Sequence, residues 1–167
     1  MNEIELTFVK PFYRQMMGLN ARRWADELWP DLTTAGRRVT GSDVSWMLRT
    51  GHWRPVVMGA WFSLAVPAES ITDDLLSAMA ESRGSLTAGP LATAATLVAG
   101  RNAVTAMADY LAFVFGLGRR DGSQHVVAAA MEYLGADPVV DPGDDGRRQF
   151  RVLHDVAIRL REAFRPT

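Results

Sequence analysis

Side chains suited to metal binding or acid–base chemistry are few and far apart in this sequence. The three histidines are His52, His125 and His154, and none belongs to a His-x-x-x-His or Glu-x-x-His pair. Such spacings place two ligands on one helix face, as zinc sites require. There is no cysteine, which excludes a disulfide framework, a thiol nucleophile and any thiolate metal site. We therefore expect neither a metal nor a cofactor.

The motifs of nucleophilic and nucleotide-dependent enzymes are also missing. No Gly-x-Ser-x-Gly segment occurs, and the single lysine, Lys10, excludes a Ser-x-x-Lys pair. Gly116 and Gly118 lack the preceding strand and the third glycine of a dinucleotide-binding fingerprint. The sequence therefore predicts a protein that is not an enzyme.

Four aspartates gather in a connection rich in proline and glycine over residues 135–146. They are Asp137, Asp141, Asp144 and Asp145. Clustered carboxylates can hold calcium, but this segment lacks the spacing and the closing glutamate of an EF-hand loop. A solvated acidic loop is the plainer interpretation. As a binding site, the loop would present negative charge to a basic surface, in imitation of the phosphates of a nucleic acid.

Trp46, His52, Trp53 and Arg54 form a second group of candidate binding residues. Tryptophan and arginine are enriched among the side chains that contribute most to protein–protein binding. The structural alternative is that Trp53 packs the first helical layer and that Arg54 caps the C-terminus of a neighbouring helix. We expect Trp46 to be exposed, because other residues form the apolar stripe of its helix.

Paired arginines offer a different function, which is phosphate binding. They occur at 22–23, 37–38, 119–120 and 147–148. Aligned along one face, they would form a basic stripe for nucleic acid. The formal net charge of −1 makes the chain as a whole no electrostatic attractor for phosphates. We therefore expect no tight binding to nucleic acid.

These candidate residues must be positioned by the chain's apolar segments, of which Gly51–Pro67 is the longest. Its apolar residues fall on every side of a helical wheel, which predicts a central buried helix. Trp61 and Leu64 should be nearly fully buried, and Pro67 ends the helix. The run is too short to span a bilayer, which needs roughly 20 apolar residues.

Other helices follow from periodicity and capping residues. No segment clearly has the pattern of a sheet strand, although Ile4, Leu6 and Phe8 alternate as they would in one. Pro30 should kink or split the second helix. The last helix should carry a ladder of opposite charges along one face, formed by Arg151, Asp155, Arg159 and Glu162. The expected ranges are 11–17, 21–35, 42–50 capped by Ser42, 72–82 capped by Thr72, 90–99, 103–115, 124–134 capped by Ser123, and 147–164.

The order of these helices predicts an all-α fold. Antiparallel pairs recur after roughly 30 residues, which is typical of a helical solenoid. The segment 94–104 resembles a HEAT repeat, in which a small-residue helix ends in a glycine turn. We expect one domain over 1–167, with 1–40 as an N-terminal helical cap and 41–167 as HEAT-like helix pairs. The pairs would be 43–50 with 53–66, 72–82 with 90–99, and 103–115 with 124–134.

Residues from Phe8 to about Leu134 resemble an uncharacterised bacterial family, domain-of-unknown-function family six thousand. The matching elements are Val9-Lys10-Pro11-Phe12-Tyr13, Trp53-Arg54-Pro55 with Trp61, and Ala88-Gly89. Where the family often carries Tyr-Asp-Gln, this chain has Asp121-Gly122-Ser123-Gln124. The family has no known activity, so the resemblance implies a fold rather than a function.

Small helical proteins of this kind occur among the immunity proteins of bacterial toxin systems. We therefore expect a non-enzymatic module that binds and neutralises a cognate protein toxin by occluding its active site. The alternative is a HEAT-like nucleic-acid-binding or base-repair protein that uses the arginine pairs. The acidic, polar start Met1-Asn2-Glu3 is unlike a signal peptide. We expect a soluble, cytoplasmic protein without a membrane partner.

Overall fold

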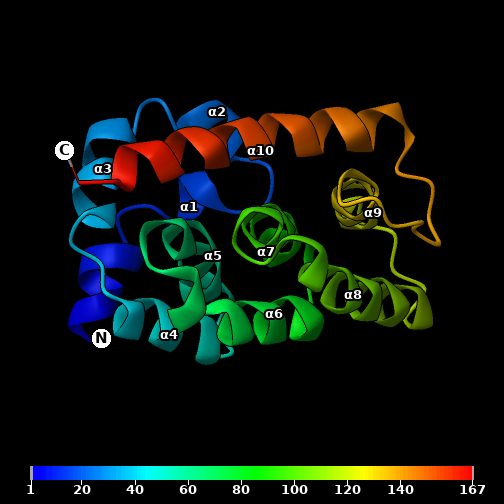
Figure 1. Ribbon diagram of the computed structural model, residues 1–167, viewed down its shortest axis with the longest axis horizontal. Coiled ribbons are helices and arrows are strands. Elements are labelled where there is room, and N and C mark those ends of the chain that lie inside the picture. The colour runs from blue at the N-terminus through cyan, green and yellow to red at the C-terminus, as the bar shows by residue number, and fades with distance from the viewer. Residues whose placement is uncertain (1, 167) are drawn as a thin grey trace.

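The computed structural model describes residues 2–166, and this part of the chain forms helices and no strand (Figure 1). The predicted all-α class is therefore confirmed. None of the helices formed by these residues is long and apolar enough to cross a membrane.

The N-terminal region consists of short helices. They are the π-helical turn η1 (Glu5–Val9), α1 (Tyr13–Met16), α2 (Ala21–Trp24) and α3 (Trp29–Gly36). The helix expected over 21–35 is thus divided in two. Pro30 stands in the first turn of α3, where its missing N–H removes no helical hydrogen bond.

The helix α4 (Gly41–Arg49) is capped by Thr40, not by Ser42 as predicted. The Thr40 Oγ1 accepts a hydrogen bond from the Asp43 N–H at 3.2 Å. In return, the Asp43 carboxylate accepts from the Thr40 N–H at 2.9 Å. This capping box satisfies two backbone donors at once, so it fixes the start of the helix two residues earlier.

The predicted central helix is α5 (Trp53–Phe62), continued by the 3₁₀ turn η2 (Ser63–Ala65). Trp61 is 0% exposed and Leu64 is 6% exposed, as expected. The indole Nε1–H of Trp61 donates to the Met16 carbonyl at 2.9 Å, which attaches α5 to α1. Burial of this helix therefore fixes the N-terminal segment against the core.

A second buried helix, α7 (Ser85–Val98), shares the centre of the molecule. It starts five residues before the predicted range, and Pro90 lies inside it. Pro90 has no N–H to offer the Leu86 carbonyl four residues back. The N–H of Gly18 takes that place at 2.8 Å. A contact with the N-terminal segment thus makes an internal proline acceptable.

The remaining elements include several differences from the predicted caps. They are η3 (Ala68–Ser70), α6 (Thr72–Glu81), η4 (Gly100–Ala103), α8 (Val104–Gly116), α9 (Ser123–Tyr133) and α10 (Gly143–Phe164). Thr72 does not cap α6, because its hydroxyl donates to the Ala68 carbonyl at 2.7 Å. Before α9, the Asp121 carboxylate accepts from the Ser123 N–H at 3.0 Å. Asp121, not Ser123, therefore supplies the side-chain acceptor at the start of this helix.

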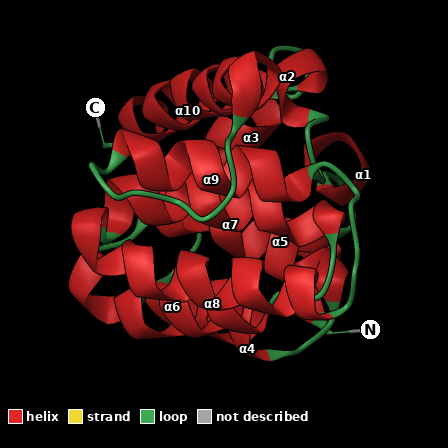
Figure 2. Cartoon of the chain, turned by 90° about the vertical axis from the view of Figure 1, so that its right-hand side faces the viewer, coloured by secondary structure: helices red, strands yellow, loops and turns green. Residues whose placement is uncertain are grey.

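The helices form three layers (Figures 1 and 2). Along one side run α4, α6 and α8; α5, α7 and α9 form the middle; and α10 crosses the other side beside α2 and α3. The predicted pairs, α4 with α5, α6 with α7 and α8 with α9, pack directly against each other. The middle layer is therefore covered on both sides. A HEAT-like repeat stays a prediction.

The end of α10 packs closely on α3. A Cβ on Gly36 would lie 2.2 Å from the Phe164 ring, so only glycine allows this approach. The charge ladder predicted along α10 is not formed as expected, because Arg159 pairs with Asp26 at 2.8 Å. Its guanidinium also lies 4.5 Å from the centre of the Trp29 ring. These contacts hold the chain's last helix against its N-terminal region.

Candidate interaction surface

The two predicted groups of binding residues lie far apart. Trp46, His52, Trp53 and Arg54 belong to α4, α5 and their connection, whereas the four aspartates lie between α9 and the first turn of α10. In Figure 1 these regions occupy the left half and the right-hand end of the molecule. They therefore do not form one continuous site.

The acidic segment is different from the predicted loop. Asp144 and Asp145 stand in the first turn of α10, which begins four residues before the predicted range and where the helix dipole favours negative charge. Arg147 has a guanidinium nitrogen 3.5 Å from Asp141 and another 3.7 Å from Asp144. Asp145 pairs with Arg148. Three of the four carboxylates thus have arginine partners within the chain, and Asp137 is exposed.

Arg147 also joins α10 to α9. Its Nε and one terminal nitrogen donate to the Glu132 carboxylate at 2.8 and 2.9 Å. This hydrogen bonding lowers the pKa of Glu132 below its ordinary value. Over residues 2–166, no three histidine, aspartate or glutamate side chains gather closely enough to hold a metal ion.

Trp53 is the first residue of α5 and is half-buried. Its indole meets the Tyr13 ring edge-on, with 5.6 Å between ring centres. The Arg54 guanidinium lies 4.9 Å from the Trp53 ring centre and 5.4 Å from that of Tyr13. Arg54 therefore stacks on two aromatic rings and does not cap a neighbouring helix. The side chain stays exposed.

Arg14 completes this cluster at the hydroxyl group of Tyr13. Its Nε donates to the Tyr13 hydroxyl oxygen at 3.1 Å, and its guanidinium lies 5.9 Å from the ring centre. The hydrogen bond from Arg14, together with the charges of Arg14 and Arg54, lowers the pKa of Tyr13 against the opposing effect of burial. We call Tyr13, Arg14, Trp53 and Arg54 the Tyr13–Trp53 platform.

An open groove of about 810 Å³ adjoins the platform, and Trp53 forms part of its wall. The groove lies between α4, α5, α6 and the start of α7. Its apolar lining includes Leu48, Val56 and Leu86, and its charged lining consists of Arg49, Asp74, Glu81 and Arg83. The Arg83 guanidinium is held 4.0 Å from the centre of the Phe113 ring. The groove thus combines an apolar floor with charges of both signs.

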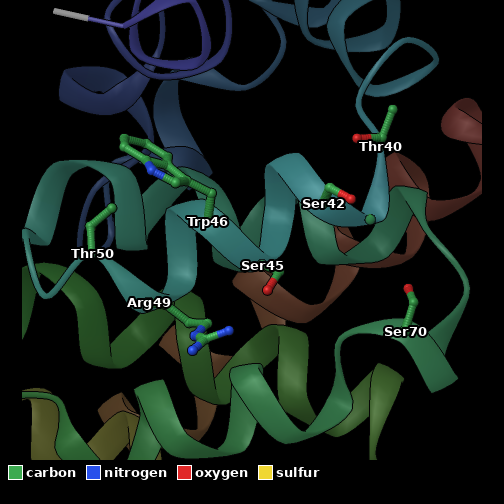
Figure 3. A pocket seen from close by; sticks show the side chains of 8 residues that line it. Thr40, Ser42, Ser45, Trp46, Arg49, Thr50 and Ser70 are labelled. Carbon is green, nitrogen blue, oxygen red and sulfur yellow. The ribbon is translucent and has the colours of Figure 1, made fainter.

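Trp46 is half-buried instead of fully exposed. It lines a separate, shallow hollow of about 690 Å³ along α4 (Figure 3). Ser45 and Arg49 line the same hollow, and Figure 3 shows the three side chains leaving α4 in different directions. The Ser45 hydroxyl donates to Asp74 of α6, and the Arg49 Nε lies 4.0 Å from the same carboxylate. Arg49 is the residue that lines both the hollow and the groove.

His52 lies beside Trp53 but takes no part in the stacking. Its side chain is exposed, and its backbone N–H donates to the Thr50 Oγ1 at 3.2 Å. Trp53 and Arg54 thus contact each other at the surface, and their role in partner binding stays a prediction. The sequence-based prediction missed Arg14 and the role of Tyr13, although the resembling segment Val9–Tyr13 contained the tyrosine.

The paired arginines do not gather into one stripe. They lie at or beside α2, α3, the end of α8 and the start of α10. Arg37 donates to the Ala163 carbonyl at 3.0 Å and Arg119 to the Arg83 carbonyl at 2.7 Å. Arg147 and Arg148 form ion pairs with carboxylates of the chain. Several of these guanidinium groups are therefore committed to contacts within the chain.

Comparison with known proteins adds no further constraint. No family model matches this chain, and neither a curated protein nor a solved structure matches it significantly. The resemblance based on the Val9–Tyr13 and Trp53–Pro55 segments is thus neither supported nor opposed.

Proposed function

We propose that this protein is a non-enzymatic protein-binding module, and that it binds its partner through the Tyr13–Trp53 platform and the adjoining groove. The observation that carries the proposal is the stacking of the exposed Arg54 on Trp53 and Tyr13 at the edge of the groove. Arginine and tryptophan dominate the energetics of many protein interfaces. Stacking holds both side chains in place, so less conformational entropy is lost on binding.

The partner that we propose is a cognate bacterial toxin, which would make the protein an immunity protein. Support comes from the lack of enzymatic motifs and from the class of small helical proteins that the sequence resembles. A rigid three-layer helical body could block an active site by docking its platform beside it. Inhibition would then need no chemistry of its own.

Single-stranded nucleic acid is the second candidate partner. The platform offers suitable contacts, because bases stack on aromatic rings and arginine interacts with phosphates. The dispersed arginine pairs offer no path for a phosphate backbone beyond the platform. Anisotropy titration with a labelled oligonucleotide tests this candidate, and tight, steeply salt-dependent binding would favour it over a protein partner.

The protein-binding proposal is tested by partner capture with matched variants. Arg23 lies 4.9 Å from the centre of the Trp24 ring, so it reproduces the arginine–tryptophan stack at a place without the groove. A tagged chain would be expressed in its native host and captured after cross-linking. We expect one partner to be recovered with wild type and with Arg23→Ala, and to be lost with Arg54→Ala.

Capture must be followed by reconstitution from purified proteins. The identified partner should form a stable complex with wild type, inhibit growth when expressed alone and be neutralised by co-expression. If Arg54→Ala and Arg23→Ala bind and protect equally well, the platform is not the binding surface.

A further inference from the structure

Two guanidinium groups converge on Tyr13, and residues 2–166 supply no counterion to either of them. The Arg14 and Arg54 groups lie 5.9 and 5.4 Å from the centre of the same ring. Among residues 2–166, neither has a carboxylate oxygen within 4.0 Å. Like charges brought close together repel, and an anion placed between them would relieve that repulsion.

The hydroxyl of Tyr13 adds a third donor to this place. Its oxygen accepts the hydrogen bond from Arg14, and within residues 2–166 its proton has no acceptor of its own. A carboxylate can accept from a hydroxyl and from two guanidinium groups together, and such charge-assisted hydrogen bonds are the strong ones. The platform therefore has the donors for an anion.

At the opposite end of the molecule, most charged side chains of the acidic segment do have counterions. The aspartates that the sequence singled out are compensated by Arg147 and Arg148. The acidic segment thus offers less uncompensated charge to a partner than its sequence indicates. Of these two surfaces, the cationic platform therefore carries more charge without a counterion.

We propose that the partner is a protein with an acidic surface, and that it places an aspartate or glutamate carboxylate between Arg14 and Arg54 and a neighbouring apolar side chain in the groove beside Trp53. This inference rests on the proposed function, because it names the chemistry of the partner at the same surface. The charges are the opposite of those expected from the sequence, which predicted that a basic partner binds the acidic loop.

The groove distinguishes a carboxylate-bearing protein from a nucleic acid. Asp74 and Glu81 line it together with the apolar residues. A phosphodiester backbone that left the platform along the groove would meet charges of both signs, because Arg49 and Arg83 line it beside these acids. Such a backbone carries only negative charge, so it has nothing to pair with the acids. A protein can instead follow one carboxylate with a leucine or a basic side chain. The mixed lining therefore favours the protein partner.

The test uses a short acetylated peptide of alternating glutamate and leucine, with a glutamine–leucine peptide and a thymidine oligonucleotide as comparisons. Binding is followed by the indole N–H signal of Trp53 in two-dimensional NMR, assigned with Trp53→Phe. We expect the glutamate peptide to shift this signal and the glutamine peptide to leave it in place. Arg14→Gln and Arg54→Gln should each weaken binding about tenfold or more.

Two further variants sharpen the result. Arg38 is exposed and has no hydrogen bond, ion pair or ring contact from its side chain within residues 2–166, so Arg38→Gln should bind like wild type. Tyr13→Phe keeps the ring but removes the hydroxyl donor, and should weaken binding less than either arginine variant. Equal binding of both peptides, tighter binding of the oligonucleotide, or no shift at about 5 mM peptide would each overturn the proposal.

The captured partner separates this inference from the proposed function. If the partner binds in a way that depends on Trp53 but is unchanged by Arg14→Gln and by added salt, the platform is an interface without carboxylate recognition. The proposed function then stands and this inference fails.

Discussion

At the scale of single residues, the buried side chains explain how the proposed binding surface is held in place. Trp61 is 0% exposed and donates to the Met16 carbonyl, three residues after Tyr13 in the chain. Removal of the indole would therefore loosen both the core and the segment that carries the platform. Burial of Trp61 could be predicted from the sequence because it follows from an apolar helix. Its hydrogen-bond partner, 45 residues away, could not.

Trp61→Ala should lower the free energy of unfolding by roughly 3–5 kcal/mol, because it leaves a large cavity in the core. Urea denaturation measures this change. Trp61→Phe refills most of the space but leaves the Met16 carbonyl without its donor, so it should cost about 1–3 kcal/mol. A loss below about 1 kcal/mol for the alanine variant, within the range of ordinary substitutions, would show that α5 is not central to the core.

We expect His154 of α10 to make the stability of the protein sensitive to acid. It is 7% exposed, and its ring lies 4.7 Å from that of Tyr133 and 5.3 Å from that of Phe150. Its Nε2 has no hydrogen-bond partner among residues 2–166. Burial lowers the pKa of His154, against the opposing charge of Asp155. Glu132, Arg147 and Arg151 are the other charged groups that line the same cleft.

The sign of the pH effect follows from proton binding. His154 takes up a proton near pH 6.5 in the unfolded chain, whereas the folded chain takes it up only at lower pH. The unfolded state therefore binds more protons below about pH 6.5, and stability falls from there toward the folded pKa. We expect the melting temperature to drop between about pH 7 and pH 5.5, and His154→Leu to reduce that drop.

His52→Gln is the matched control, since His52 is exposed. It should leave the pH dependence unchanged. An equal slope in wild type and His154→Leu would assign the acid sensitivity to other groups.

At the scale of helices, most elements could be predicted from periodicity, while their ends depended on contacts from elsewhere. The start of α4 had a local signal, because Thr40 and Asp43 form a Thr-x-x-Asp capping pattern. The start of α7 had none. Pro90 suggested a helix beginning, and only the distant Gly18 N–H makes it acceptable inside the helix.

Pro90→Ala tests this explanation of α7. Alanine restores an N–H inside the helix, which would compete with Gly18 for the Leu86 carbonyl. We expect faster hydrogen exchange at the Gly18 amide in the variant, measured by NMR. Exchange at the Trp61 indole, which is bonded to the Met16 carbonyl and not to α7, serves as the internal control. Unchanged exchange at Gly18 would mean that this bond does not depend on the proline.

At the scale of the whole molecule, the all-helical class and the packing of neighbouring helices followed from the sequence. The surface did not, because it depends on which distant residues meet. Tyr13 and Trp53 come from different helices, and the layers bring them into contact. The aspartates provide the opposite example. The sequence suggested a loop whose carboxylates have no counterions, but α10 starts early and brings Arg147 and Arg148 to three of them.

We propose that a partner binds at the Tyr13–Trp53 platform and along its groove. Hydrogen exchange detected by mass spectrometry, with and without the captured partner, tests it most directly. We predict that binding protects the segments around 13–14 and 52–56 and those of the groove at 77–87, while 137–145 exchanges at the same rate in both states. Protection confined to 137–145 would contradict the account and place the interface on the acidic segment instead.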